Sequence, residues 1–201
     1  MPEDLKIEED GLVMYLESCH GMNRDLQQKI LSTPNAILDS LNAQTVYEFV
    51  KQSCPPEVAL TITQDLDRHE DARENFCKAI RNYRKYGYAT WYHWSCNNWG
   101  TKWNSYNQAR TSENSFSFDT AWAHPFPIMS ELSKMFRSIV FEIKYADEDI
   151  GANVGHYRII GGITTYLLDT DDKEECRRFA CAVQGYDYDQ WIADRLIEQK
   201  E

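Results

Sequence analysis

The chain has 201 residues, of which 42% are hydrophobic and 26% charged. This balance fits a globular protein whose core needs neither a metal nor disulfides. The formal net charge of −11 repels nucleic-acid phosphates, so we expect no direct binding of DNA or RNA. No run of about 18 apolar residues occurs and the N-terminus is acidic, which predicts no transmembrane helix, no secretory signal and a cytoplasmic location.

Residues 1–86 are predicted to form helices joined by short turns. Apolar residues recur at helical spacing in 26–31 and 46–50, and Pro55-Pro56 ends one helix and suits the start of the next. The clearest predicted helix spans residues 71–86. Asp71 and Glu74 predict a capping box at its start, and Gly87 occupies the usual position of a C-terminal glycine. We therefore predict a helical N-terminal region over residues 1–86.

Residues 87–201 are predicted to form a second region that begins with strands. Gly161-Gly162 is typical of a two-residue hairpin turn. Further helices are expected after Pro127, after the acidic stretch 169–175 and around Trp191. The order predicts an α+β fold with helices on one face of a mainly antiparallel sheet, forming one compact unit with residues 1–86. The predicted strands are residues 115–122, 139–145, 157–160 and 163–168.

Five of the six tryptophans lie between Trp91 and Trp122. Trp99 and Trp103 are separated by a turn at Gly100-Thr101, and strand pairing would bring Asp119 near Lys102. We expect the tryptophans to anchor the sheet, with the Lys102–Asp119 pair beside them, because buried aromatic rings usually carry packing. The alternative is a recognition surface; base stacking on the rings is disfavoured by the net charge. The candidate binding residues are Asn98, Trp99, Lys102, Trp103, Asp119 and Trp122.

The tryptophan segment also resembles a known family. Asn98-Trp-Gly-Thr-Lys-Trp-Asn104, Phe118-Asp-Thr-Ala-Trp122 and Pro125-Phe-Pro127 are similar to Api-like proteins of phages, plasmids and prophages, whose function is unknown. The resemblance covers roughly residues 85–168 and implies a ferredoxin-like α+β domain without an iron–sulfur cluster. It also implies a bacterial mobile-element setting. Family members commonly open with a strand carrying Asn-Trp-Cys, whereas helices are predicted here. Further matching positions are Leu132, Phe136, Tyr145, Glu148, Gly151 and Gly155.

Metal ligation is considered for two pairs of residues. His93-x-x-Cys96 and Cys176-x4-Cys181 contain zinc-ligand residue types. Cysteines five apart on a helix do not share a face, and we expect His93 to Cys96 to be extended. We therefore predict no metal and no cofactor. The six cysteines are expected to stay reduced, because they are scattered and no export signal precedes them.

Two enzymatic alternatives remain open. Cys96 with His93 or His124 is the one candidate for a thiol nucleophile and its base. The carboxylates of Asp147–Asp149 and of 169–175 are numerous enough for a magnesium-dependent hydrolase, although such runs are usually only solvated.

These observations favour a non-enzymatic accessory protein of a phage or mobile element. We expect it to act in the bacterial cytoplasm by binding a host or phage protein, with an anti-defence or host-takeover role as the working hypothesis. A small hydrolase and a virion-associated structural module are the alternatives. The sequence leaves the oligomeric state open.

Overall fold

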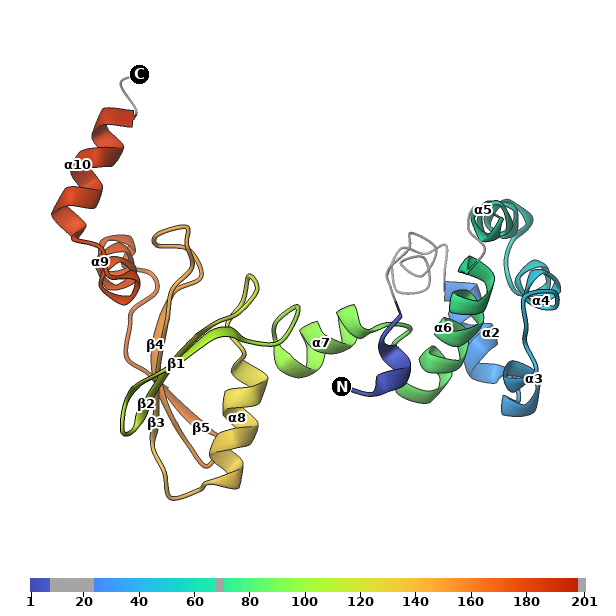
Figure 1. Cartoon of the computed structure of the whole chain (residues 1–201), viewed down its shortest axis with the longest axis horizontal. Helices are drawn as coiled ribbons and strands as arrows, with labels where there is room; N and C mark the ends of the chain where they lie inside the picture. The colour runs from blue at the N-terminus through green and yellow to red at the C-terminus, as the bar shows by residue number, and fades with distance from the viewer. Residues whose placement is uncertain (8–23, 68–70, 199–201) are drawn as a thin grey trace. The chain divides into compact units, whose positions relative to one another are not determined.

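A computed structural model describes residues 1–7, 24–67 and 71–198 (Figure 1). The chain divides into two compact units, Met1–Ser95 and Cys96–Glu201. The division falls inside helix α7 (Trp91–Trp99), later than the boundary predicted after residue 86. Among the described residues, no helix is long and apolar enough to cross a membrane.

The N-terminal unit is helical, as predicted. Its core is formed by apolar side chains from successive helices, including Leu26, Val50 and Ile62, which are fully buried. Amphipathic helices of this length gain most of their stability from such packing. The elements are η1 (Glu3–Leu5), α2 (Arg24–Ser32), α3 (Asn35–Asp39), α4 (Val46–Ser53), α5 (Pro56–Leu66) and α6 (Ala72–Tyr86).

Helix α6 confirms one predicted terminus and contradicts the other. Gly87 ends the helix with a left-handed φ of +77°, and its N–H donates to the Tyr83 carbonyl at 2.9 Å. At the start, Asp71 makes no side-chain capping hydrogen bond, so the predicted capping box is wrong. Asp71 has helical backbone angles, whereas a capping side chain reaches the first free N–H groups from an extended backbone.

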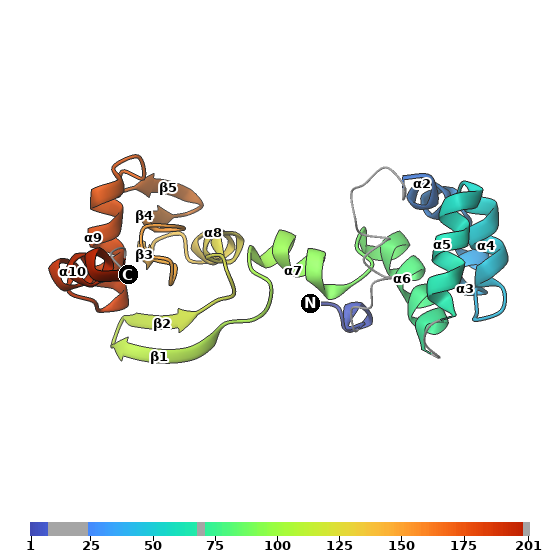
Figure 2. The ribbon, with the colours of Figure 1, turned by 90° about the horizontal axis from the view of Figure 1, so that it is seen from above.

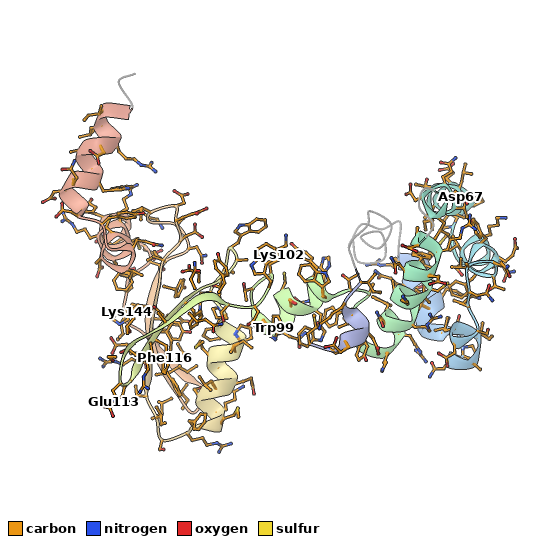
Figure 3. The ribbon with its side chains drawn as sticks, viewed as in Figure 1. Asp67, Trp99, Lys102, Glu113, Phe116 and Lys144 are labelled. Atoms are coloured by element: carbon orange, nitrogen blue, oxygen red, sulfur yellow. The ribbon has the colours of Figure 1, made fainter. Side chains whose placement is uncertain are left out.

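A polar cluster links three helices of this unit. The Tyr47 hydroxyl from α4 donates to Asp67, which follows α5 and is labelled in Figure 3. Arg73 of α6 donates to the same carboxylate at 2.7 Å and lies over the Tyr47 ring. The hydrogen bonds from Tyr47 and Arg73 hold the pKa of Asp67 below its usual value.

The strands expected directly after Gly87 are not observed, because residues 91–99 form α7. His93 and Cys96 are therefore helical rather than extended. Trp91, Ser95 and Trp99 recur every four residues along this helix, and Ser95 is fully buried. Aromatic residues have a high β propensity, but burial on a helical period outweighs it here.

The C-terminal unit has the predicted α+β character with antiparallel strands. A two-stranded sheet pairs β1 with β2, and a three-stranded sheet has the order β3-β4-β5. The predicted Gly161-Gly162 hairpin joins β4 and β5, and the predicted helices are all present. The elements are β1 (Tyr106–Ser112), β2 (Ser115–Asp119), α8 (Phe126–Met135), β3 (Phe141–Tyr145), β4 (Gly155–Ile160), β5 (Ile163–Tyr166), α9 (Lys173–Gln184) and α10 (Tyr188–Glu198).

Helices meet both faces of the three-stranded sheet (Figure 2). Neighbouring β4 residues point to opposite faces. On one face, the Tyr157 ring lies 5.7 Å from Phe126 of α8; on the other, the His156 ring stacks on Phe179 of α9 at 5.4 Å. The Asp172 carboxylate caps α9 by accepting from two backbone N–H groups. The expectation of helices on one face is thereby refined to one helix on each face.

Two buried polar atoms lie among the aromatic rings under α8. His124 stacks on Tyr145 with ring centroids 4.1 Å apart, and lies 5.4 Å from the Tyr157 ring. The His124 Nδ1 and the Tyr157 hydroxyl are buried and have no hydrogen-bond partner within the described part of the chain. Burial lowers the pKa of His124 to about 4, since the apolar surroundings disfavour the imidazolium.

Replacing Tyr157 by Phe is expected to stabilise the protein by about 1 kcal/mol, because it removes a buried hydroxyl without a partner while retaining the ring. Tyr47→Phe is the matched control, since its hydroxyl does donate a hydrogen bond. Thermal unfolding should show a higher Tm for the first variant and a lower or unchanged Tm for the second. A loss of stability in Tyr157→Phe would contradict the burial of an unpartnered hydroxyl.

Acidification is expected to destabilise the protein through His124. The folded-state pKa of about 4 lies below the usual 6.5. Between pH 4 and pH 6.5 the unfolded chain therefore binds the His124 proton more readily than the folded protein does. Stability from this group is complete above pH 6.5 and is lost as the pH falls toward 4. His124→Phe should therefore show a smaller decrease in Tm between pH 7 and pH 5 than the unsubstituted protein. Equal decreases would show that His124 titrates normally.

Candidate protein-binding site

The β1–β2 hairpin brings the two tryptophan segments together. Tyr106 and Asp119 are cross-strand partners at its open end, so the chain entering β1 and the chain leaving β2 run side by side. The Thr101 hydroxyl donates to the Ala121 carbonyl at 3.1 Å, and both residues are buried. This hydrogen bond joins the Trp-Gly-Thr-Lys-Trp segment to the Thr-Ala-Trp segment.

Two unusual backbone conformations fix this junction. Gly100 has a φ of +81°, and a Cβ at this position would lie 2.7 Å from Pro127 Cδ. Only glycine fits there without strain. Trp122 also has a left-handed φ, of 60°, and its carbonyl accepts a hydrogen bond from Asn153 at 3.1 Å. A non-glycine residue adopts this conformation at a cost, so the surrounding contacts must hold it.

Lys102 lies within cation–π distance of two tryptophans. Its Nζ is 4.8 Å from the ring centroid of Trp103 and 5.0 Å from that of Trp122. Trp122 is 75% exposed and Trp103 is 46% exposed. Figure 3 shows Lys102 in the loop that precedes β1. We refer to Lys102, Trp103 and Trp122 as the Trp–Lys platform.

The exposure of the platform corrects an expectation from the sequence. Trp103 and Trp122 do not anchor the sheet in a core, whereas Trp99, at the end of α7, is half-buried. Asp119 accepts a hydrogen bond from Asn107 at 2.7 Å, while the Lys102–Asp119 pair stays a prediction. Asn98 is exposed on α7. Of the six candidate residues, the structure therefore brings Lys102, Trp103 and Trp122 together.

The sequence reasoning missed the exposed hairpin itself. Every residue of β1 and β2 is exposed, and Phe116, labelled in Figure 3, is 70% exposed beneath the Arg110 guanidinium. Phe116 and Phe118 share one face, because strand side chains alternate. An isolated two-stranded hairpin is marginally stable in water. The alternation in Phe116-Ser-Phe118 was the available signal for this one-sided aromatic strand.

The candidate thiol and metal residues lie on two helices, α7 and α9, and in the loop before α8. Cys176 and Cys181 are buried in the core beneath α9. Burial raises the pKa of Cys54 and Cys77 to about 11, so these thiols are protonated at neutral pH. Cys96 is half-buried on α7. No group of three or more His, Cys, Asp or Glu side chains suited to a metal occurs within the described ranges; Cys19 lies outside them.

The acidic runs have local structural roles. The Asp147 carboxylate accepts from the backbone N–H of Asp149 at 3.0 Å and from the Asn153 side chain at 3.3 Å. Asp169 accepts from the N–H of Asp171 at 2.9 Å, and Asp172 caps α9. These bonds are typical of Asx turns and helix caps. They account for the position of three of the carboxylates that the magnesium hypothesis would use.

One known family matches part of the chain. Residues 98–189 match the family described as the ferredoxin-like domain in Api92-like protein. The match begins at Asn98 and includes the platform, the hairpin and both sheets, and it supports the resemblance found in the sequence. The helical N-terminal unit lies outside it. No curated protein and no solved structure matches the chain.

Replacing Gly100 by Ala is expected to destabilise the ferredoxin-like domain by about 2–4 kcal/mol, because a left-handed backbone and a clash with Pro127 add together. Gly185→Ala is the matched control: Gly185 has nearly the same φ, +80°, but nothing within 4 Å of an added Cβ. It should cost only about 1 kcal/mol. Chemical denaturation of both variants measures the two losses in free energy of unfolding. Equal losses would show that Pro127 moves to make room for the added methyl group.

Proposed function

We propose that this protein acts by binding another protein through the Trp–Lys platform. The observation that carries this proposal is that Trp122 is 75% exposed although its backbone is held in a strained conformation. A large apolar ring on a backbone that is already fixed loses little backbone entropy on binding. Tryptophan is also the residue type most enriched among the hot spots of protein interfaces.

The electrostatics favour a protein partner over a nucleic acid. Lys102 contributes one positive charge to the platform, whereas the chain as a whole carries −11. Binding to a phosphate backbone depends on several cationic contacts. Acidic side chains lie close by, since Asn153 bonds both to the Trp122 carbonyl and to Asp147. An apolar pocket with a basic rim is the partner surface that matches these features.

The biological setting is part of the same proposal. The resemblance to Api-like proteins supports an accessory protein of a phage or other mobile element that acts in the bacterial cytoplasm. The partner is then a host or phage protein, and interference with host defence or host takeover is the role that such a binder would serve. Cys176 and Cys181 are buried, and Asp147, Asp169 and Asp172 accept hydrogen bonds in turns or a helix cap, which favours binding over hydrolysis at these residues.

The test is a comparison of exposed-residue variants in a binding assay. Partners recovered from a bacterial lysate with the full chain would be purified and titrated against it by calorimetry. Trp122→Ala is expected to weaken binding by about 2 kcal/mol or more, as hot-spot tryptophans do, with an unchanged Tm. Lys102→Gln should weaken binding less and reduce its dependence on salt.

Tyr186→Ala is the matched control, because Tyr186 is an exposed aromatic residue outside the platform. Its variant should bind as the unsubstituted chain does. Recovery of the same partner at equal affinity with Trp122→Ala, Trp103→Ala and Tyr186→Ala would refute the platform as the binding site. Failure to recover any stoichiometric partner would refute the wider proposal.

A further inference from the structure

Strand β5 leaves one edge of the three-stranded sheet unpaired within the described residues (Figure 2). Ile163 is 73% exposed and Tyr166 is 70% exposed. The opposite outer strand, β3, carries Glu142 and Lys144, and charges of this kind protect an edge from further pairing. Residues 159–168 contain neither a charge nor a proline. The β5 edge therefore lacks the usual protection.

The free hydrogen-bonding groups of this edge can be assigned. The Leu167 N–H donates to the His156 carbonyl of β4 at 2.9 Å. In an antiparallel pair the backbone groups of successive residues point alternately toward and away from the neighbouring strand. Thr165 and Ile163 thus bond to β4, as Leu167 does. The N–H and C=O groups of Thr164 and Tyr166 point outward from the sheet edge.

We propose that β5 pairs antiparallel with β5 of a second copy of this chain, about a two-fold axis at Thr165. In this register Thr164 lies opposite Tyr166 of the second copy. The outward-pointing N–H and C=O groups of these two residues can then form hydrogen bonds between the two strands. Ile163 lies opposite Leu167, and Thr165 lies opposite its own symmetry mate. Opposed residues point to the same face, so each pair also makes side-chain contact. The two sheets become one continuous sheet.

Charge complementarity favours a second copy as the occupant. Two chains that each carry −11 repel one another, so they can meet only where the surface is uncharged or complementary. Lys134, which also pairs with Glu131 at 2.6 Å, lies against the β4–β5 turn, where a Cβ on Gly162 would come within 3.1 Å of its Cε. Asp169 and Asp171 follow β5. Antiparallel pairing brings these carboxylates of each copy to the Lys134 end of the other.

A disulfide test is specific for this register. Thr165 is exposed, and its symmetry mate would be a directly opposed, non-hydrogen-bonded neighbour with Cβ atoms about 4.5–5.5 Å apart. Thr165→Cys should therefore form an intermolecular disulfide under mild oxidation. Thr164→Cys, whose thiol would face Tyr166, is the matched control. Mass spectrometry distinguishes the introduced disulfide from any that involves the natural cysteines. Equal crosslinking of both variants would overturn the register.

The oligomeric state tests the pairing itself. Analytical ultracentrifugation of the full chain across the micromolar range should show a concentration-dependent dimer. Thr164→Pro removes one outward N–H and leaves the bonds to β4 intact, since proline is tolerated on an edge strand. Tyr166→Lys places two like charges within the contact. Each should weaken dimerisation by about tenfold or more.

Two controls keep the outcomes separate. Leu60→Lys adds the same charge at an exposed apolar position on α5 and should dimerise normally. Trp122→Ala should also dimerise normally, so the dimer and the platform are tested independently. A chain that stays monomeric at every concentration overturns the proposal, as does a dimer that survives both edge variants with unchanged affinity.

Discussion

The buried hydrogen bond from Thr101 to the Ala121 carbonyl is the contact on which the exposed site depends. It closes the open end of a hairpin whose own strands bury nothing, and so supplies the tertiary support that an isolated hairpin lacks. Gly100 allows this approach because Pro127 leaves no room for a side chain. The Trp-Gly-Thr-Lys-Trp pattern is thus explained by backbone packing, with the tryptophans displayed as a consequence.

The periodic elements were predictable from sequence because their signals are local. The α6 helix, its end at Gly87 and the Gly161-Gly162 hairpin follow from spacing and glycine geometry. Helix α7 was not predictable in this way, because its aromatic residues have a high β propensity. The burial of Ser95, which fits a helical period, is visible only in the structure. The exposure of Trp103 and Trp122 was also hidden. Hydrophobicity predicts burial only on average, so the exposure of a particular tryptophan does not follow from composition or spacing.

The two units differ in how they use apolar residues. In the N-terminal unit the helices converge on one core, which contains Phe76 and Ile80 at full burial. In the C-terminal unit the aromatic side chains are divided among the ring cluster under α8, the His156–Phe179 and Tyr188–Trp191 stacks, the platform and the hairpin. Exposed rings contribute little to folding stability. The proposed binding surface lies in this unit, which is also the part of the chain that the family match covers.

A net charge of −11 also determines where such a protein can associate. General repulsion keeps acidic chains apart at low ionic strength, and salt shortens its range to about 8–10 Å near physiological conditions. Association with another acidic protein is then favoured only at surfaces that are locally neutral or basic. The platform, with Lys102 between two rings, and the uncharged β5 edge are two such surfaces. For the proposed binding at the platform and the β5 edge, acidity adds selectivity, because it opposes non-specific contacts over most of the surface.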